Sequence, residues 1–228
     1  MSVTDARRTL IDVGRWEPDT ADRLRLAALE LFVEQGYETT TVDDIVARVG
    51  VTQRTFFRHF ADKEEVLFDE DASMQKILID AAGAYVRQHE PCPDIGLGAA
   101  RAATAALARS FDKERARHRA RWQVLAHVPS LQGRQLVKQQ RWGTELRAVL
   151  VDNGVPPTDA SVAVEVASAA LRLAYAEWLT GGRPKRLFPL LTASNARFDA
   201  VLRRSDPDTP GTGGIGTATE RPSPARST

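Results

Sequence analysis

The stretch TTTVDDIVARVGVTQRTFFRHF, residues 39–60, predicts two short helices joined by a tight turn. Thr41 is a good N-cap for the first helix, because its hydroxyl can accept a hydrogen bond from a free backbone N–H, and Asp44 can reach back to complete a capping box. Gly50 supplies the left-handed residue that ends this helix, and Thr52 caps the second. A helix, a glycine-containing turn and a second helix make up a helix-turn-helix motif.

The second predicted helix, residues 53–60, carries the side chains that would contact DNA. Phe56 and Phe60 are four residues apart and share its buried face. Its other faces hold arginine, which pairs with guanine, and glutamine, which pairs with adenine. A solvated polar face on a small core helix is the alternative, since short helix-turn-helix matches also arise by chance.

Residues 23–68 resemble the DNA-binding domain of the TetR family, the tetracycline-repressor-like regulators. The rest of the chain resembles that family only in its length and helical character. One position departs from the family pattern, because Phe57 stands where a tyrosine hydroxyl often touches a phosphate; Phe57 can offer only a packing contact. The matching residues are Ala28-Leu-Glu-Leu-Phe32, Gly36-Tyr37, Thr40-Thr41-Val42, Ile45, Gly50-Val51, Thr55-Phe56-Phe57, His59-Phe60, Lys63-Glu64 and Leu67.

The resemblance implies a sequence-specific DNA-binding transcriptional regulator, most simply a homodimeric repressor that a small ligand releases from a palindromic operator. Gln53 and Arg54 would read bases, and other side chains of the motif would hold phosphates. The expected salt dependence is modest, because residues 48–63 hold four basic residues against one acidic residue, whereas residues 1–62 hold eight against eleven. The predicted DNA-contacting residues are Thr41, Thr52, Gln53, Arg54, Thr55, Phe57, Arg58, His59 and Lys63.

Composition narrows the class of protein. The chain has 228 residues, of which 43% are hydrophobic, so it can bury a substantial core, and its net charge of +1 says little about partners. Its single cysteine, Cys92, excludes an intramolecular disulfide and is typical of a reducing compartment. We expect a cytoplasmic protein without membrane association, because no signal peptide is evident and charges interrupt the most apolar stretch, residues 162–179.

Helical periodicity without any strand pattern predicts an all-α protein of about nine helices. Asp62 is expected to cap one long helix, residues 62–89, that leaves the head and links it mechanically to the body. The expected divisions are a flexible arm at residues 1–18, a helix-turn-helix domain at 19–65, a ligand-binding and dimerisation domain at 66–204, and a disordered tail at 205–228.

The resemblance also implies that two late helices, residues 158–180 and 185–203, pair with their symmetry mates in a four-helix bundle. Thr158 is the expected cap of the first of these helices, and its many alanines suit the close approach of a neighbouring helix. A two-fold dimer would present two recognition helices, so the operator should be a palindrome or nearly one.

Six aromatic residues of the body are candidates for an apolar or aromatic ligand pocket, although each one singly is more often part of a core. Residues 101–147 hold eleven basic residues and three acidic ones. A solvated face partnering acidic surfaces such as Asp69-Glu70-Asp71 is favoured over an anionic ligand or a nucleic-acid contact, because basic residues at alternate positions, 113–121, point all round a helix. The six candidates are Tyr85, Phe111, Trp122, Trp142, Tyr175 and Trp178.

An enzyme is not expected, because the sequence shows no nucleophile elbow, P-loop, metal-ligand cluster or cofactor site, and no catalytic residue. His89 and Cys92 are too few for a zinc site. A G-x-G-x-x-G match at residues 211–216 has no preceding strand and no following helix. A ligand-independent DNA-binding or adaptor protein, or an activator with the same head, is the alternative; a body cavity of roughly several hundred Å³ would favour the ligand-responsive repressor.

Overall fold

The structure is a computed structural model that describes residues 19–68, 71–181 and 186–204. Within these ranges the chain forms nine α-helices and one short 3-10 helix, and none of the described residues is in a strand, which confirms the all-α prediction. The predicted arm, residues 1–18, and tail, residues 205–228, lie outside the described residues. The helices are α1 (Thr20–Glu34), α2 (Val42–Val49), α3 (Gln53–His59), α4 (Asp71–Gln88), α5 (Ile95–Phe111), α6 (Arg115–His127), α7 (Pro129–Asp152), α8 (Pro157–Thr180) and α9 (Leu187–Arg204), with the 3-10 helix at Glu65–Leu67.

The helix-turn-helix motif folds as its local signals predict. The Thr41 hydroxyl accepts from the Asp44 N–H at 3.2 Å, and the Asp44 carboxylate accepts from the Thr41 N–H at 2.8 Å, so the capping box is confirmed. These bonds from the backbone and hydroxyl of Thr41 hold the pKa of Asp44 below its ordinary value. Gly50 ends α2 at a φ of 76°, where a side chain would strain the backbone. Phe56 and Phe60 are both buried.

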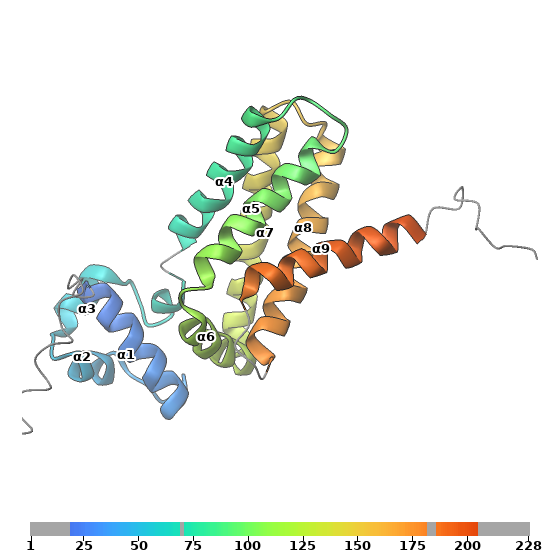
Figure 1. The fold of residues 1–228 in the computed structure, drawn as a ribbon. Helices are drawn as coiled ribbons and strands as arrows, with labels where there is room; N and C mark the ends of the chain where they lie inside the picture. Colours follow the sequence, from blue (N-terminus) through green and yellow to red (C-terminus); the bar gives the residue numbers. More distant parts are fainter. Residues whose placement is uncertain (1–18, 69–70, 182–185, 205–228) are drawn as a thin grey trace, which may run out of the picture.

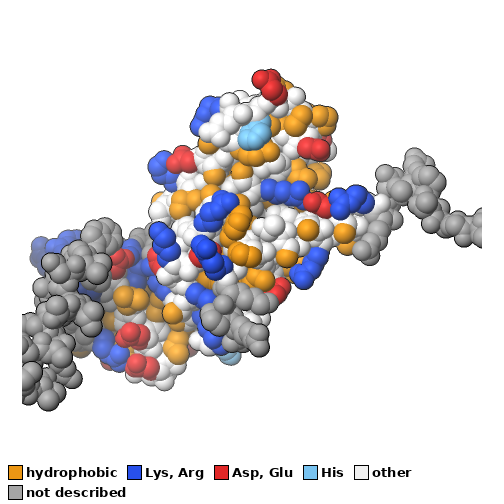
Figure 2. Space-filling view, viewed as in Figure 1, with side chains coloured by type: hydrophobic (Ala, Val, Ile, Leu, Met, Phe, Trp, Pro, Cys, Tyr) orange, Lys and Arg blue, Asp and Glu red, His pale blue; other side chains and the backbone are white. Residues whose placement is uncertain are grey.

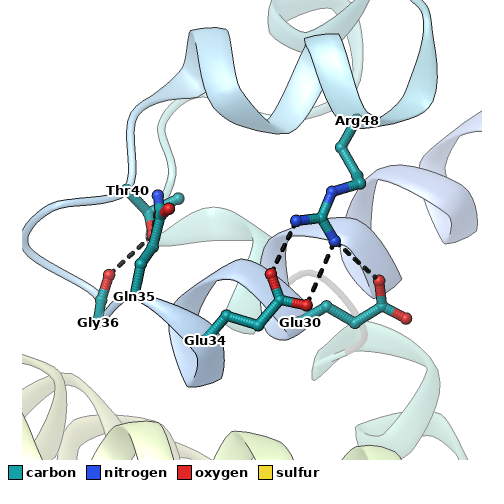
Figure 3. A network of polar contacts seen from close by, with 6 residues as sticks. All are labelled: Glu30, Glu34, Gln35, Gly36, Thr40 and Arg48. Atoms are coloured by element: carbon teal, nitrogen blue, oxygen red, sulfur yellow. Dashed lines mark hydrogen bonds and ion pairs between the residues drawn. The ribbon is translucent and has the colours of Figure 1, made fainter.

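A polar network on the outside of the head holds α2 against α1 (Figure 3). Arg48 of α2 donates to Glu34 of α1 at 2.7 Å and lies 3.6 Å from Glu30. The hydrogen bond between Arg48 and Glu34 lowers the pKa of Glu34 and raises that of Arg48. In the turn between the helices, the buried Thr40 hydroxyl donates to the Gly36 carbonyl at 2.8 Å. The orientation of α2 therefore depends on residues that the motif itself does not contain.

The body is a bundle whose central helix is α5 (Figure 1). Helix α5 packs on α4, α8 and α9, and Figure 1 shows α4, α5, α7 and α8 running lengthwise beside one another. Helix α6 lies across the end of the bundle that faces the head, where it packs on α1. Small side chains let the neighbouring helices approach α5 closely; its fully buried alanines are Ala99, Ala100, Ala103 and Ala108.

The apolar side chains form two clusters, and one of them spans the head and the body. The larger cluster fills the bundle and includes residues of α4, α5, α7, α8 and α9. The second unites the head with the end of α6 and the start of α7 through Val124, Leu125, Val128 and Leu131. The domain boundary expected at residues 65 and 66 falls inside this second cluster.

The long helix predicted for residues 62–89 is wrong. Asp62 accepts from the Glu65 N–H at 2.7 Å, but it begins only the short 3-10 helix Glu65–Leu67, and α4 begins at Asp71. The reason is that three consecutive residues, 66–68, are all buried in the second cluster. Three consecutive positions cannot all face one side of an α-helix, whose residues are about 100° apart.

Helix α8 differs in two respects from the prediction. It begins at Pro157 rather than after Thr158, because a proline at the first helical position has the required φ and needs no hydrogen-bond partner for its nitrogen. Most of its alanines are buried inside this chain, where α8 packs on α5, and so are not free for a second copy. The buried alanines of α8 are Ala160, Ala163, Ala167, Ala170 and Ala174.

Candidate functional site

Helix α3 presents a polar face outside the head. Arg54 and Arg58 are exposed, and neither has a hydrogen-bond or ion-pair partner within the described part of the chain. Phe57 is 53% exposed, while its ring edge packs on Phe56 with centroids 5.4 Å apart. Thr52 accepts from the Thr55 N–H at 3.2 Å and anchors the start of the helix. The arrangement leaves two guanidinium groups and one aromatic ring to meet a partner.

Two other predicted contact residues are already held by neighbours. The Gln53 amide donates to the Asp43 carboxylate of α2, which orients its oxygen as the remaining acceptor. His59 is half-buried, and its Nε2 atom is enclosed without a hydrogen-bond partner in the described structure. Thr41 is exposed, although its hydroxyl is engaged in the capping box.

Lys63, predicted to contact DNA, makes hydrogen bonds within the head. Its Nζ atom donates to the carbonyl oxygens of Tyr37 at 2.8 Å and of Thr40 at 3.0 Å, and it lies 4.3 Å from the centroid of the Tyr37 ring. Lys63 therefore braces the turn between α1 and α2. With Arg48 paired to α1 as well, the local positive charge available to DNA is carried mainly by Arg54 and Arg58.

A cavity of about 720 Å³ lies within the body and extends to the head. Its walls come from α4 to α8, and at one end from α1 and the 3-10 helix, through Leu29 and Leu67. Such a volume is in the range of small-molecule sites in proteins. The apolar part of the wall includes Met74, Leu78, Leu107, Phe111, Trp142 and Leu146.

The structure brings three of the six predicted aromatic residues together at this cavity, namely Phe111, Trp142 and Tyr175. The other three do not line this cavity. Trp178 is 1% exposed within the body core, Tyr85 stacks on His89 with centroids 3.9 Å apart, and Trp122 is 37% exposed at the surface. Helical periodicity in the sequence shows which aromatic residues share one face of a helix. It does not show whether that face lines a cavity or packs in a filled core.

His118 is a cavity residue that the sequence did not indicate. Its Nδ1 atom lies 3.1 Å from the Tyr175 hydroxyl, and both residues line the cavity. Burial, together with the charges of Arg117, Arg121 and Lys138, lowers the pKa of His118 to about 3. Burial also raises the pKa of Tyr175 to about 12. The pair is therefore uncharged at neutral pH and can donate or accept hydrogen bonds.

The basic residues of α6 were expected to form a solvated face, and the structure corrects this in part. Arg117 and Arg121 both line the cavity, whereas Arg119 is exposed. Arg115 instead donates to the carbonyl oxygens of Trp178 at 2.7 Å and Gly181 at 3.0 Å, at the end of α8. Arginines two positions apart on α6 do point to different sides of the helix, as expected. One of these sides faces the cavity, however, and part of the other contacts the end of α8.

One arginine joins the cavity to the head. Arg121 Nε donates to the Leu67 carbonyl at 2.6 Å, and its Nη2 donates to the Gln135 side chain at 2.7 Å. Its guanidinium carbon lies 5.0 Å from the centroid of the Phe68 ring. The 3-10 helix that follows the DNA-binding motif is thus held by a side chain of the cavity wall.

A second arginine holds the same 3-10 helix from α7. Arg134 donates to Glu65 at 2.9 Å and to Glu64 at 3.3 Å, and it lies 4.7 Å from the centroid of the Phe68 ring. Burial acts to lower the pKa of Arg134, but the hydrogen bonds to Glu65 and Glu64 outweigh it and raise that pKa. Arg134 does not line the cavity, so it stabilises this joint independently of any ligand.

The described residues contain no group of three or more side chains suited to hold a metal ion. Among the described helices, none combines the length and apolarity that a bilayer crossing requires.

The sequence profile described as bacterial regulatory proteins of the tetR family matches residues 24–69. The transcriptional regulator TcmR of Streptomyces glaucescens is 50% identical over 62 residues, which are 27% of this chain and 27% of TcmR, so that match spans about a quarter of the relative. MftR of Mycobacterium tuberculosis, whose name associates it with regulation of mycofactocin biosynthesis, is 29% identical over 83% of this chain and 92% of its own.

Among solved structures, FadR of Thermus thermophilus, a TetR-family transcriptional repressor in complex with lauroyl-CoA, matches with a TM-score of 0.51 and 20% identity. The match covers 90% of this chain and all of FadR, and at this identity it shows a shared fold. The helix-turn-helix head, the helical body behind it and the similarity to these relatives all indicate the same class of protein. Residues 24–69 therefore form a DNA-binding domain of the tetR family type, and the chain as a whole is similar to TetR-family transcriptional regulators in sequence and fold.

Proposed function

We propose that the protein is a cytoplasmic homodimeric repressor that binds a palindromic operator and is released from it by a small ligand. In this proposal residues 19–65 bind DNA and residues 66–204 hold the ligand and the dimer contact. The observation that carries the proposal is the cavity of about 720 Å³, whose wall includes the arginine that holds the end of the DNA-binding head. A filled body would instead favour a ligand-independent adaptor.

Helix α3 would enter the major groove of the operator. Arg54 would pair with a guanine, and Gln53, oriented by Asp43, would accept from a base amino group. Phe57 would pack against a base methyl group or sugar. Arg58, with the hydroxyls of Thr52 and Thr55 and the ring of His59, would hold phosphates and set the register of the head, whereas the Thr41 hydroxyl already donates to Asp44.

The dimer contact would use the outward faces of α8 and α9. Exposed apolar side chains lie on both helices: Val162 and Leu173 on α8, and Val201 and Leu202 on α9. Because most α8 alanines are used inside the chain, this contact would depend on these larger side chains, together with Ala169 and Ala176, which are not buried. A two-fold axis through the pair would place two copies of α3 on one side of the assembly.

The ligand would act by changing the position of the head relative to the body. TetR-family FadR of Thermus thermophilus, with the same fold, was solved with lauroyl-CoA bound, which supports a ligand-responsive body. A ligand that favours one arrangement of the 3-10 helix by about 1–3 kcal/mol would change operator affinity by about 5–150-fold.

Selection of bound DNA from a random pool, with purified full-length protein at controlled salt, tests the proposal. We expect an enriched inverted repeat, and we expect Arg54→Ala to relax the preference at one position of each half-site, at a cost of about 1–3 kcal/mol per contact. If a folded dimer enriches no sequence, or if Arg54→Ala binds every operator variant as the parent does, the base-reading role is wrong.

A further inference from the structure

Three rings of the cavity wall meet where α5, α6 and α8 come together, and we call Phe111, His118 and Tyr175 the aromatic corner. The rings of Phe111 and His118 have centroids 4.1 Å apart, and the Tyr175 ring makes T-shaped contacts with both, at 5.9 Å from each. The Tyr175 ring also lies 5.7 Å from that of the buried Trp178. Rings packed in this way hold the Tyr175 side chain, and with it the hydroxyl, in one position.

His118 sets the direction of the Tyr175 hydroxyl. Its Nδ1 atom lies 3.1 Å from that hydroxyl, and burial is the largest cause that lowers the pKa of His118 to about 3 and raises that of Tyr175 to about 12. At neutral pH the imidazole therefore has one N–H and one acceptor nitrogen, and the phenol keeps its proton. Two arrangements follow: the Tyr175 O–H donates to Nδ1, or the Nδ1–H donates to the Tyr175 oxygen.

Either arrangement leaves the Tyr175 oxygen able to bond to a ligand. In the first arrangement the oxygen can accept a hydrogen bond, and in the second its O–H can donate one. A ligand hydroxyl both donates and accepts, so it fits both arrangements, whereas a carbonyl or ether oxygen fits only the second. Because a buried polar group costs free energy unless it is hydrogen-bonded, the corner favours a ligand whose hydroxyl reaches Tyr175.

Several other polar side chains of the wall already bond within the chain. The Thr104 hydroxyl donates to a carbonyl of its own helix at 3.2 Å, and the Thr144 hydroxyl does the same at 3.0 Å. The Gln135 oxygen accepts from Arg121 at 2.7 Å. The Tyr175 hydroxyl uses one of its hydrogen-bonding positions on His118 and retains others for a ligand.

The remainder of the ligand should be apolar, because apolar side chains of α4, α5, α7 and α8 form much of the wall. On the face shown in Figure 2, by contrast, hydrophobic side chains of the body lie among charged ones. An apolar ligand therefore buries more apolar surface by entering the cavity than by binding that face. An aromatic ring system would in addition pack against the rings of Phe111 and Tyr175.

From these contacts we infer that the effector is an aromatic compound that bears a hydroxyl group, and that this group hydrogen-bonds to the Tyr175 hydroxyl. His118 is the positioning residue, because it orients the Tyr175 hydroxyl without being required to touch the ligand. Tyr175 thus distinguishes a hydroxylated aromatic compound from the hydrocarbon of the same shape. The inference rests on the proposed function in that it assigns a chemical class of ligand to the same cavity.

Two fluorescent probes with the same fused rings, 1-hydroxypyrene and pyrene, test the class of ligand in the full-length protein at neutral pH. Tyr175→Phe removes a single oxygen from the wall. It should weaken binding of 1-hydroxypyrene about fivefold or more and leave pyrene within about twofold, because the ligand hydroxyl loses its partner. Tyr85→Phe is the matched control: Tyr85 does not line the cavity, so loss of its hydroxyl should change neither affinity.

The positioning role of His118 is tested by His118→Phe, which keeps a ring beside Phe111 but removes the hydrogen bond to Tyr175. It should lower the preference for 1-hydroxypyrene over pyrene by about twofold or more. In the Tyr175→Phe background the same change should leave the remaining preference unaltered, because His118 acts only through the Tyr175 hydroxyl. An equal effect in both backgrounds would overturn the positioning role, and equal weakening of both probes by Tyr175→Phe would overturn the hydroxyl contact.

Release of the selected operator separates this inference from the proposed function. In the parent protein 1-hydroxypyrene should lower operator affinity about fivefold or more, and Tyr175→Phe should reduce that response. Equal binding and equal release by both probes would support a ligand-responsive repressor and overturn the hydroxylated class. Selective binding of 1-hydroxypyrene without release would support the hydroxyl contact and overturn the ligand-responsive repressor. Binding of neither probe would overturn the inference, while an enriched inverted repeat would still support operator binding.

Discussion

Helices α3 and α6 both carry closely spaced arginines, but they use them in opposite ways. On α3, Arg54 and Arg58 extend from the surface without partners among the described residues. On α6, Arg115 and Arg121 donate to main-chain carbonyls of α8 and of the 3-10 helix. Helix ends and short turns have carbonyl groups without internal partners, and a neighbouring guanidinium can satisfy several of them. The same residue type is thus left exposed to solvent on one helix and stabilises tertiary structure on the other.

The largest expected effect distinguishes the two faces of α3. Phe56→Ala should lower the free energy of unfolding by about 3–5 kcal/mol, because the ring is fully buried between the head helices. Phe57→Ala, one residue later and half-exposed, should cost about 0.5 kcal/mol or less but weaken operator binding. Denaturant unfolding and operator titration of both variants measure the contrast. Equal losses of stability would show that α3 is not oriented as described.

Removal of an α6 arginine should have the next largest effect on stability. Arg115→Ala should lower the free energy of unfolding by about 2 kcal/mol, since the carbonyl oxygens of Trp178 and Gly181 lose a charged donor. Arg119→Ala, exposed on the same helix, should change it by about 0.5 kcal/mol or less. Thermal or denaturant unfolding of the two variants measures the difference in their free energies of unfolding. A loss in Arg119→Ala as large as in Arg115→Ala would mean that helix propensity, not the contact, is responsible.

His118 should make the stability of the body depend on pH. Its pKa is lowered from 6.5 to about 3 in the folded protein, so between these values the unfolded chain binds a proton that the folded chain excludes. The free energy of unfolding should therefore fall as pH falls, by about 2 kcal/mol between pH 6.5 and 5. His118→Gln should remove this part of the pH slope. Parallel pH profiles for the two proteins would contradict the burial of a neutral imidazole.

The smallest expected effect concerns the phosphate contacts of α3. If Arg58 neutralises one phosphate in each subunit, Arg58→Gln should reduce the slope of log affinity against log salt by about two for the dimer. Lys63→Gln should leave that slope unchanged, because its ammonium group holds the carbonyls of Tyr37 and Thr40. Operator titrations at several salt concentrations measure both slopes. A change of slope in Lys63→Gln would restore the phosphate contact first predicted for it.

Several body residues could not be assigned from sequence for a common physical reason. His118 is a lone histidine among arginines, and only the folded chain shows that it meets Tyr175 across a cavity. Trp142 and Trp178 were equal candidates for the ligand pocket, yet one lines the cavity and the other is buried in the core. The side of a helix on which a residue lies follows from its period, but what occupies that side depends on residues far away in the chain.

The sequence by itself determined the helix-turn-helix motif. The capping box of Thr41 and Asp44, the left-handed Gly50 and the cap at Thr52 each act over four residues or fewer, so their effect does not depend on the rest of the fold. The tertiary structure alone decided the break between the motif and α4, and which basic residues line the cavity. Those outcomes depend on the burial of residues 66–68 against α6 and α7, a long-range contact that overrides the local preference for a continuous helix.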